Sequence, residues 1–166
     1  MRAIHIPQLL NAPNKTIALD VDEYLSGLET LTAVKGEMSV THQGTFLDVK
    51  GKAGAIMTLE CDRCLQSYNT RVQVDTSELV WLEEASADEL VEKEVDLEDL
   101  IESLPPSGHF KPDEWLYEQM CLAIPQKQIC SADCKGIAFK NPKPSADEPV
   151  DHRWAALSAL KQQLAE

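Results

Sequence analysis

The clearest secondary-structure pattern in this chain is at residues 34–50, VKGEMSVTHQGTFLDVK. Within them Met38 and Val40 alternate with polar residues, which is the period of a strand that buries one face. Gln43-Gly44 is typical of a turn, and residues 46–50 return as a second strand. The stretch therefore predicts an antiparallel hairpin.

Further strands follow on the C-terminal side of this hairpin. Gly51 and Gly54 are expected to bracket a turn before an apolar strand at residues 55–59. Alternation resumes over residues 71–75, and an apolar run follows over residues 79–82. Four closely spaced strands predict an antiparallel β-meander or a partly closed barrel. On the N-terminal side, the spacing of the apolar residues within 22–31 predicts a short helix.

The period changes to that of a helix after residue 100. Pro112 suits the first position of a helix, and the helix is expected to run over 112–124 and to end at Pro125. Its inward residues are expected to be Leu116, Met120, Cys121 and Ile124. Strands followed by a packed helix define an α+β fold class. The expected organisation is a single domain over 1–136, a Pro-rich linker over 137–150 and a C-terminal helix over 151–166.

Two cysteine pairs carry the strongest chemical signal. Cys61 and Cys64 form a CxxC motif between two expected strands, and Cys130 and Cys134 form a CxxxC motif. Both spacings allow two thiolates to bind one tetrahedral zinc, so the sequence predicts one structural Zn²⁺ in a zinc-knuckle site. Reduced structural thiols and a redox-active CxxC are the alternatives, although a redox CxxC normally opens a helix. Cys121 is expected to be a core residue.

Composition excludes several function classes. The 166 residues contain no apolar run of about 18, so no transmembrane helix is expected. The N-terminal residues show no secretory signal, which favours a cytoplasmic location and argues against a disulfide framework. The four histidines form no catalytic motif, although His109 could join a zinc site. We therefore expect a protein that is not an enzyme and has no small-molecule substrate.

The net charge of −13 is concentrated in one segment. Residues 83–102 hold ten acidic side chains and Lys93 as their only base. Such a block is either a solvated surface or a patch that docks a basic partner. A direct RNA contact through Arg63 and Arg71 beside the cysteine motif is the alternative.

Several short motifs, in this order, resemble the YceD family of large ribosomal RNA subunit accumulation proteins. They are Cys61-Asp62-Arg63-Cys64-Leu65, Val95-Asp96-Leu97, Glu118-Gln119, Leu122-Ala123-Ile124-Pro125 and residues 130–136. The stretch from Gly108-His109-Phe110 to Gln119 is similar to the cyanobacterial and chloroplast version.

The resemblance implies a ribosome-biogenesis factor that supports synthesis, processing or stability of large-subunit (23S) ribosomal RNA. It would bind a ribosomal protein, a pre-ribosomal particle or the RNA itself, without enzymatic activity. Many bacterial members carry further cysteines after the segment that matches Cys134-Lys135-Gly136, whereas this chain has none there. One metal site is therefore expected. A thiol-based redox or zinc-handling protein is the alternative function.

Overall fold

The computed structural model describes residues 1–84, 103–137 and 157. The chain divides into two compact units, Met1–Cys134 and Lys135–Glu166, and the description below concerns the first. Among the described residues, no helix has the length and apolar character needed to span a membrane. The acidic residues 85–102 and nearly all of the expected linker and terminal helix lie outside the described residues. The predicted domain boundaries therefore stay a prediction.

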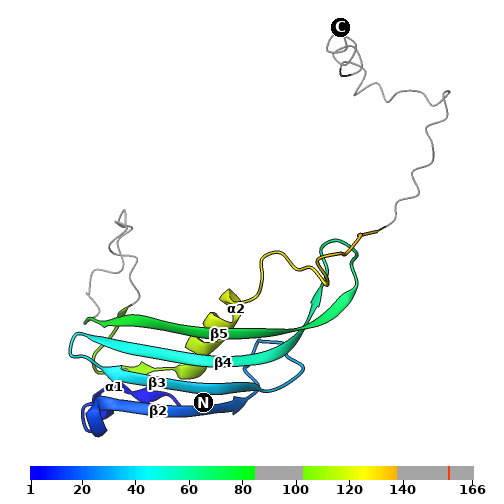
Figure 1. Cartoon of the computed structure of the whole chain (residues 1–166). Helices are drawn as coiled ribbons and strands as arrows, with labels where there is room; N and C mark the ends of the chain where they lie inside the picture. Colours follow the sequence, from blue (N-terminus) through cyan, green and yellow to red (C-terminus); the bar gives the residue numbers. More distant parts are fainter. Residues whose placement is uncertain (85–102, 138–156, 158–166) are drawn as a thin grey trace, which may run out of the picture. The chain divides into compact units, whose positions relative to one another are not determined.

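One open sheet forms the centre of the fold (Figure 1). Its strand order is β2-β3-β4-β5-β6, with β2 and β6 at the two edges, so the predicted partly closed barrel is wrong and the predicted meander is confirmed. The pairs from β2 to β5 are antiparallel, and β6 pairs with β5 in parallel. The strands are β2 (Thr16–Glu23), β3 (Val34–His42), β4 (Phe46–Glu60), β5 (Ser67–Leu82) and β6 (Ser103–Leu104).

Helix α2 (Pro112–Leu122) covers one face of this sheet, as Figure 1 shows. It begins at Pro112 as predicted and ends two residues before Ile124. Leu116 and Met120 are fully buried, while Cys121 and Ile124 pack against the core and remain partly exposed. The predicted inward face of the helix is therefore confirmed, and the α+β class with it.

Shorter elements complete the buried side. A two-stranded sheet joins β1 (Ile4–His5) to β7 (His109–Phe110), and the short helix α1 (Ile6–Leu9) and a 3-10 turn η1 (Pro13–Lys15) lead into β2. The core is apolar, as period-two alternation requires. Its fully buried side chains include Ile6, Leu9, Val34, Val40, Leu47, Val49, Val80, Leu116 and Met120.

The predicted turn at Gly51 and Gly54 is wrong, because β4 runs unbroken from Phe46 to Glu60. The ring of Trp115 on α2 occupies the space beside Gly51, where a Cβ would lie 2.6 Å from Cζ3 of the ring. Glycine in a strand can mark the close approach of another element as well as a turn. Here the absence of a side chain lets α2 lie close to the sheet.

The predicted helix over residues 22–31 is also wrong. Its first two residues belong to β2, and the segment that follows has no regular structure. The Leu31 N–H donates to the carbonyl of Ile56 (2.7 Å), and the Thr32 hydroxyl accepts from the N–H of Ile56 (3.0 Å). These hydrogen bonds pair the backbone groups of Ile56 on β4, beyond the end of β3. A helix over residues 22–31 would have left those backbone groups unpaired. Leu25 and Leu28 are buried, so the apolar spacing marks core contacts of a loop.

Gly36 on β3 provides a test of the sheet packing. A Cβ at this position would lie 2.1 Å from the carbonyl oxygen of Lys52 and 2.5 Å from Cα of Ala53, both backbone atoms of β4. We expect Gly36→Ala to lower the free energy of unfolding by about 1–3 kcal/mol, because β3 and β4 must separate to admit the methyl group. Gly44→Ala measures the cost of backbone strain alone, since a Cβ there would meet nothing within 4 Å but its φ is 101°. Urea unfolding measures both losses, and an unchanged free energy of unfolding in Gly36→Ala would contradict the close contact.

Candidate metal centre

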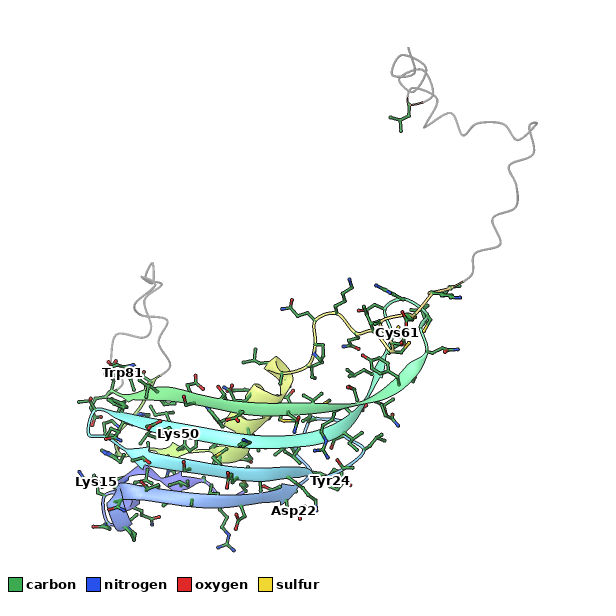
Figure 2. The ribbon with its side chains drawn as sticks, viewed as in Figure 1. Lys15, Asp22, Tyr24, Lys50, Cys61 and Trp81 are labelled. Carbon is green, nitrogen blue, oxygen red and sulfur yellow. The ribbon has the colours of Figure 1, made fainter. Side chains whose placement is uncertain are left out.

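A long hairpin arm positions the first cysteine pair. The register of β3 with β4 ends at Gly54, whereas β4 and β5 remain paired from Phe46 and Trp81 to Glu60 and Ser67. The arm therefore extends beyond the main sheet, and its tip carries Cys61 and Cys64. Figure 2 shows Cys61 at this end, with Trp81 at the opposite end of β5.

The backbone of the hairpin tip is tightly organised. The Cys61 N–H donates to the carbonyl of Gln66 (3.0 Å), and the Cys61 carbonyl accepts from the N–H of Leu65 (2.8 Å). Leu65 has a φ of 58° and its side chain is 58% exposed. The left-handed conformation costs about 1–2 kcal/mol for a residue with a Cβ. The turn therefore stores strain in a leucine that gains little burial.

The second pair lies on the segment that follows α2, and hydrogen bonds join this segment to the hairpin tip. The Asp62 N–H donates to the carbonyl of Gln128 (2.8 Å), while the Gln128 N–H donates to the carboxylate of Asp62 (2.7 Å). The guanidinium of Arg63 donates to the carbonyl of Cys134 (3.2 Å). These bonds hold the two loops side by side across 65 intervening residues.

The four predicted cysteines come together at this point. Their sulfur atoms all lie within 4.8 Å of one another. The Sγ atoms of Cys61 and Cys134 are 3.9 Å apart, and those of Cys64 and Cys130 are 3.8 Å apart. Four thiolates at about 2.3 Å from a central zinc would lie about 3.8 Å from one another. The donor set and its spacing therefore fit a tetrahedral, thiophilic metal ion.

The electrostatics of the cluster also fit a cation. The Cys130 N–H donates a hydrogen bond to the Cys61 sulfur (3.4 Å), and this bond is the main cause that lowers the pKa of Cys61 to about 6. Interactions with Cys61 and then Cys134 raise the pKa of Cys130 to about 12. One thiolate thus opposes ionisation of its neighbours, because like charges at this distance repel. A divalent cation would remove that repulsion and allow all four thiols to ionise.

A low cysteine pKa is also the property expected of a redox protein. Cys61, however, is fully buried, and Cys130 is the exposed member of the cluster. Reactive cysteines combine a low pKa with solvent access. In this cluster the two properties belong to different residues, which favours ligation over nucleophilic chemistry.

The other predicted residues lie elsewhere. His109 is not part of the cluster and contacts His5 across the β1–β7 pair, with ring centroids 4.8 Å apart. Arg71 lies on β5 in register with Ile56, on the sheet face opposite α2, whereas Arg63 is engaged with the second cysteine loop. The two arginines therefore lie on different surfaces. Sequence reasoning missed the Asp62–Gln128 contact, for which the only local signal is a polar residue inside the CxxC motif.

Comparisons with known proteins give one family match and a small set of relatives. A model of the family described as "Large ribosomal RNA subunit accumulation protein YceD" matches residues 49–161, which is more than half of the chain. Uncharacterized proteins of Mycobacterium bovis and Mycobacterium tuberculosis are each 29% identical to it over 140 residues. The match covers 73% of this chain and 65% of each relative, so the chain spans just under two thirds of their length. No solved structure matches significantly.

Proposed function

This chain belongs to the YceD family, whose description suggests a role in large-subunit ribosomal RNA accumulation, and we propose that it is a non-enzymatic cytoplasmic ribosome-biogenesis factor. It supports the synthesis, processing or stability of 23S ribosomal RNA by binding a component of the large-subunit precursor. The family match is the observation that carries this proposal.

The cysteine cluster has a structural role in this proposal. One Zn²⁺, held by Cys61, Cys64, Cys130 and Cys134, joins the β4–β5 arm to the segment after α2. The sulfur spacings of 3.8 and 3.9 Å support the assignment, as does the preference of zinc for closed four-thiolate sites. Four protein ligands leave no open coordination position for a substrate. The role of the metal is therefore structural, which is to hold the binding surface in place. Elemental analysis distinguishes zinc from iron, which accepts the same donors.

The partner is a basic protein of the large-subunit precursor. Ten acidic residues over 83–102 provide a long-range attraction for such a protein and repel RNA. The expectation is that loss of the chain lowers mature 23S RNA and raises its precursors, and that re-expression restores both. Northern blots of depleted cells test this, and unchanged RNA levels would refute the proposed function.

Two charge variants separate protein docking from RNA docking. Changing Glu92, Glu94 and Glu98 to Gln and Asp96 to Asn should weaken association with precursor particles about tenfold at low salt, because long-range attraction is lost. The melting temperature of this fourfold variant should equal that of the wild type. Arg71→Ala should leave association unchanged, and it is a cleaner probe of RNA contact than Arg63→Ala, since Arg63 also holds the second loop. Sedimentation of particles with the tagged protein measures both, and loss only in the arginine variant would establish direct RNA binding.

The second candidate function is thiol-based redox or zinc handling, which the low pKa of Cys61 favours. Rapid alkylation of the native protein by iodoacetamide, together with reversible loss of the metal, would support it. Slow alkylation with one retained zinc per chain would support the structural role.

A further inference from the structure

We propose that the edge strand β2 binds an extended, basic segment of the protein partner as an additional strand of the sheet. The segment pairs with the free side of Thr16–Glu23 and places lysine or arginine side chains on the sheet face opposite α2. This inference rests on the proposed function, because it names the surface that the basic partner contacts.

One side of β2 has no strand beside it (Figure 1). In an antiparallel sheet, successive residues direct their N–H and carbonyl groups to opposite sides of the strand. The hydrogen bond from the Gln43 N–H to the Phe46 carbonyl sets this alternation along β3, and the register of β2 with β3 transfers it to β2. The residues of β2 whose backbone groups point away from β3 are therefore Ala18, Asp20 and Asp22. In the described part of the chain, no backbone hydrogen bond reaches these three residues from that side.

The buried face of β2 leaves apolar surface accessible at this edge. Ile17 and Leu19 pack against the core, opposite Val40 and Met38, and both remain partly exposed. Their exposed surface adjoins the free backbone groups. Alternate apolar side chains on an added strand would cover it, because neighbouring strands pack their side chains in cross-strand pairs.

The other face of β2 favours a basic occupant. An open hollow of about 570 Å³ lies on the sheet face opposite α2, and Ala18, Asp20 and Glu37 are among its lining residues. Asp20 and Glu37 lie directly opposite each other in the register, where like charges repel. A lysine or arginine on an added strand beside Asp20 can extend its side chain into this hollow and remove the repulsion.

The basic residues on this face are engaged elsewhere. Three ion pairs join Lys35 to Asp22 (3.1 Å), Lys50 to Asp48 (2.7 Å) and Lys52 to Asp75 (3.0 Å). Lys52 also lies opposite Glu37, but its hydrogen bond to Asp75 is the main cause of its raised pKa. Arg71 is on β5 at the far side of the sheet, and Lys15 precedes Asp20 by about 17 Å of extended chain. Among the described residues, no ion pair involves Asp20 or Glu37.

These properties distinguish between possible occupants. A second copy of β2 would bring its own Asp20 and Asp22 to the edge, so charge disfavours pairing of two identical strands. RNA has no backbone N–H and carbonyl pattern that can extend a sheet, and its phosphates are repelled by the two unpaired carboxylates. An extended protein segment in which basic and apolar residues alternate satisfies the free backbone groups, the apolar edge and the carboxylates together.

The test is a titration of the full-length chain with a capped eight-residue peptide of alternating lysine and valine, which matches the length of β2. Amide exchange followed by NMR should slow at Ala18, Asp20 and Asp22. Ala18→Pro should weaken binding about tenfold or more, because proline removes an outward N–H and leaves the pairing of β2 with β3 intact. Asp20→Asn should weaken binding about fivefold, because it removes one charge and keeps the backbone. This second variant decides the test if the proline variant is unstable.

Two matched controls accompany these variants. Ser77→Pro places proline on β5, the other long edge strand, where the same alternation directs the Ser77 N–H away from β4. It should bind the peptide as the wild type does, and its melting temperature should be similar to that of Ala18→Pro. A peptide of alternating glutamate and valine should not bind.

Several outcomes would overturn the inference. They are unchanged exchange at the three β2 amides, full binding by both Ala18→Pro and Asp20→Asn, or equal binding of the glutamate peptide. Protection of these amides by a single-stranded oligoribonucleotide, or by a dimer that the lysine peptide does not displace, would assign the edge to RNA or to a second copy instead. Peptide binding at β2 with unchanged 23S RNA in depleted cells would keep the site and refute the proposed function. Loss of 23S RNA without peptide binding would refute the site alone.

Discussion

Cys61→Ser should reduce the bound metal from one ion per chain to near zero. Cys61 is the fully buried member of the cluster, and its sulfur lies 3.9 Å from that of Cys134 and accepts from the Cys130 N–H. A serine hydroxyl does not ionise at neutral pH, so the site would lose one charged ligand and its closed tetrahedral shell. Metal affinity should fall by at least about a hundredfold, because binding and local folding are coupled. Native mass spectrometry measures the stoichiometry.

The same substitution should unfold the protein locally. Residues 55–72 of the arm and 128–134 depend on the cluster, whereas the core around Val40, Val49 and Leu116 lies on the main sheet. Hydrogen exchange should therefore lose protection in the first two segments and retain it over residues 34–50. Cys121→Ser is the matched control, since Cys121 is a partly buried cysteine outside the cluster and should leave the metal content at one. Retention of the metal by Cys61→Ser would refute the proposed ligand set.

Trp115→Ala should lower the free energy of unfolding by about 3–5 kcal/mol, the usual cost of emptying the space of a large buried ring. Trp115 is 3% exposed and fills the position that Gly51 leaves open on β4. Its Nε1–H also donates to Oε2 of Glu78 (2.6 Å), which accepts a second bond from Gln119 (3.0 Å). The melting temperature should fall by roughly 10 °C or more. Differential scanning calorimetry measures both quantities.

Two further variants bracket this loss. Trp115→Phe keeps a smaller aromatic ring but removes both the donor to Glu78 and the ring atoms beside Gly51, so it should cost at least the about 1–3 kcal/mol of the hydrogen bond and less than Trp115→Ala. Trp81→Ala is the control for size, because Trp81 is 36% exposed on the opposite face of the sheet and should cost less than half as much. Equal losses for Trp81 and Trp115 would show that α2 does not depend on the contact with Gly51.

Short-range sequence patterns predict three features of this protein correctly. Alternation over residues 34–50 is confirmed as the β3–β4 hairpin, and the start of α2 at Pro112 follows from a fixed φ and a missing donor. The spacing within each cysteine pair identifies the four residues whose sulfurs lie together. All three features depend on residues within about one helical turn or one hairpin of each other. This is the range over which a repeating sequence pattern indicates secondary structure.

Other features of the fold and of the cysteine cluster depend on contacts between residues far apart in the chain. A glycine is suited both to a turn and to the close approach of another element, and only the ring of Trp115 shows which applies at Gly51. The apolar spacing in residues 24–31 suits a helix and a buried loop equally. The backbone groups of Ile56 on β4 need hydrogen-bond partners, and the loop supplies them. The joining of the two cysteine loops depends on how the β4–β5 arm and the segment after α2 lie in space. Short-range periodicity cannot encode such pairings, because the energy that selects them comes from groups far apart in the chain.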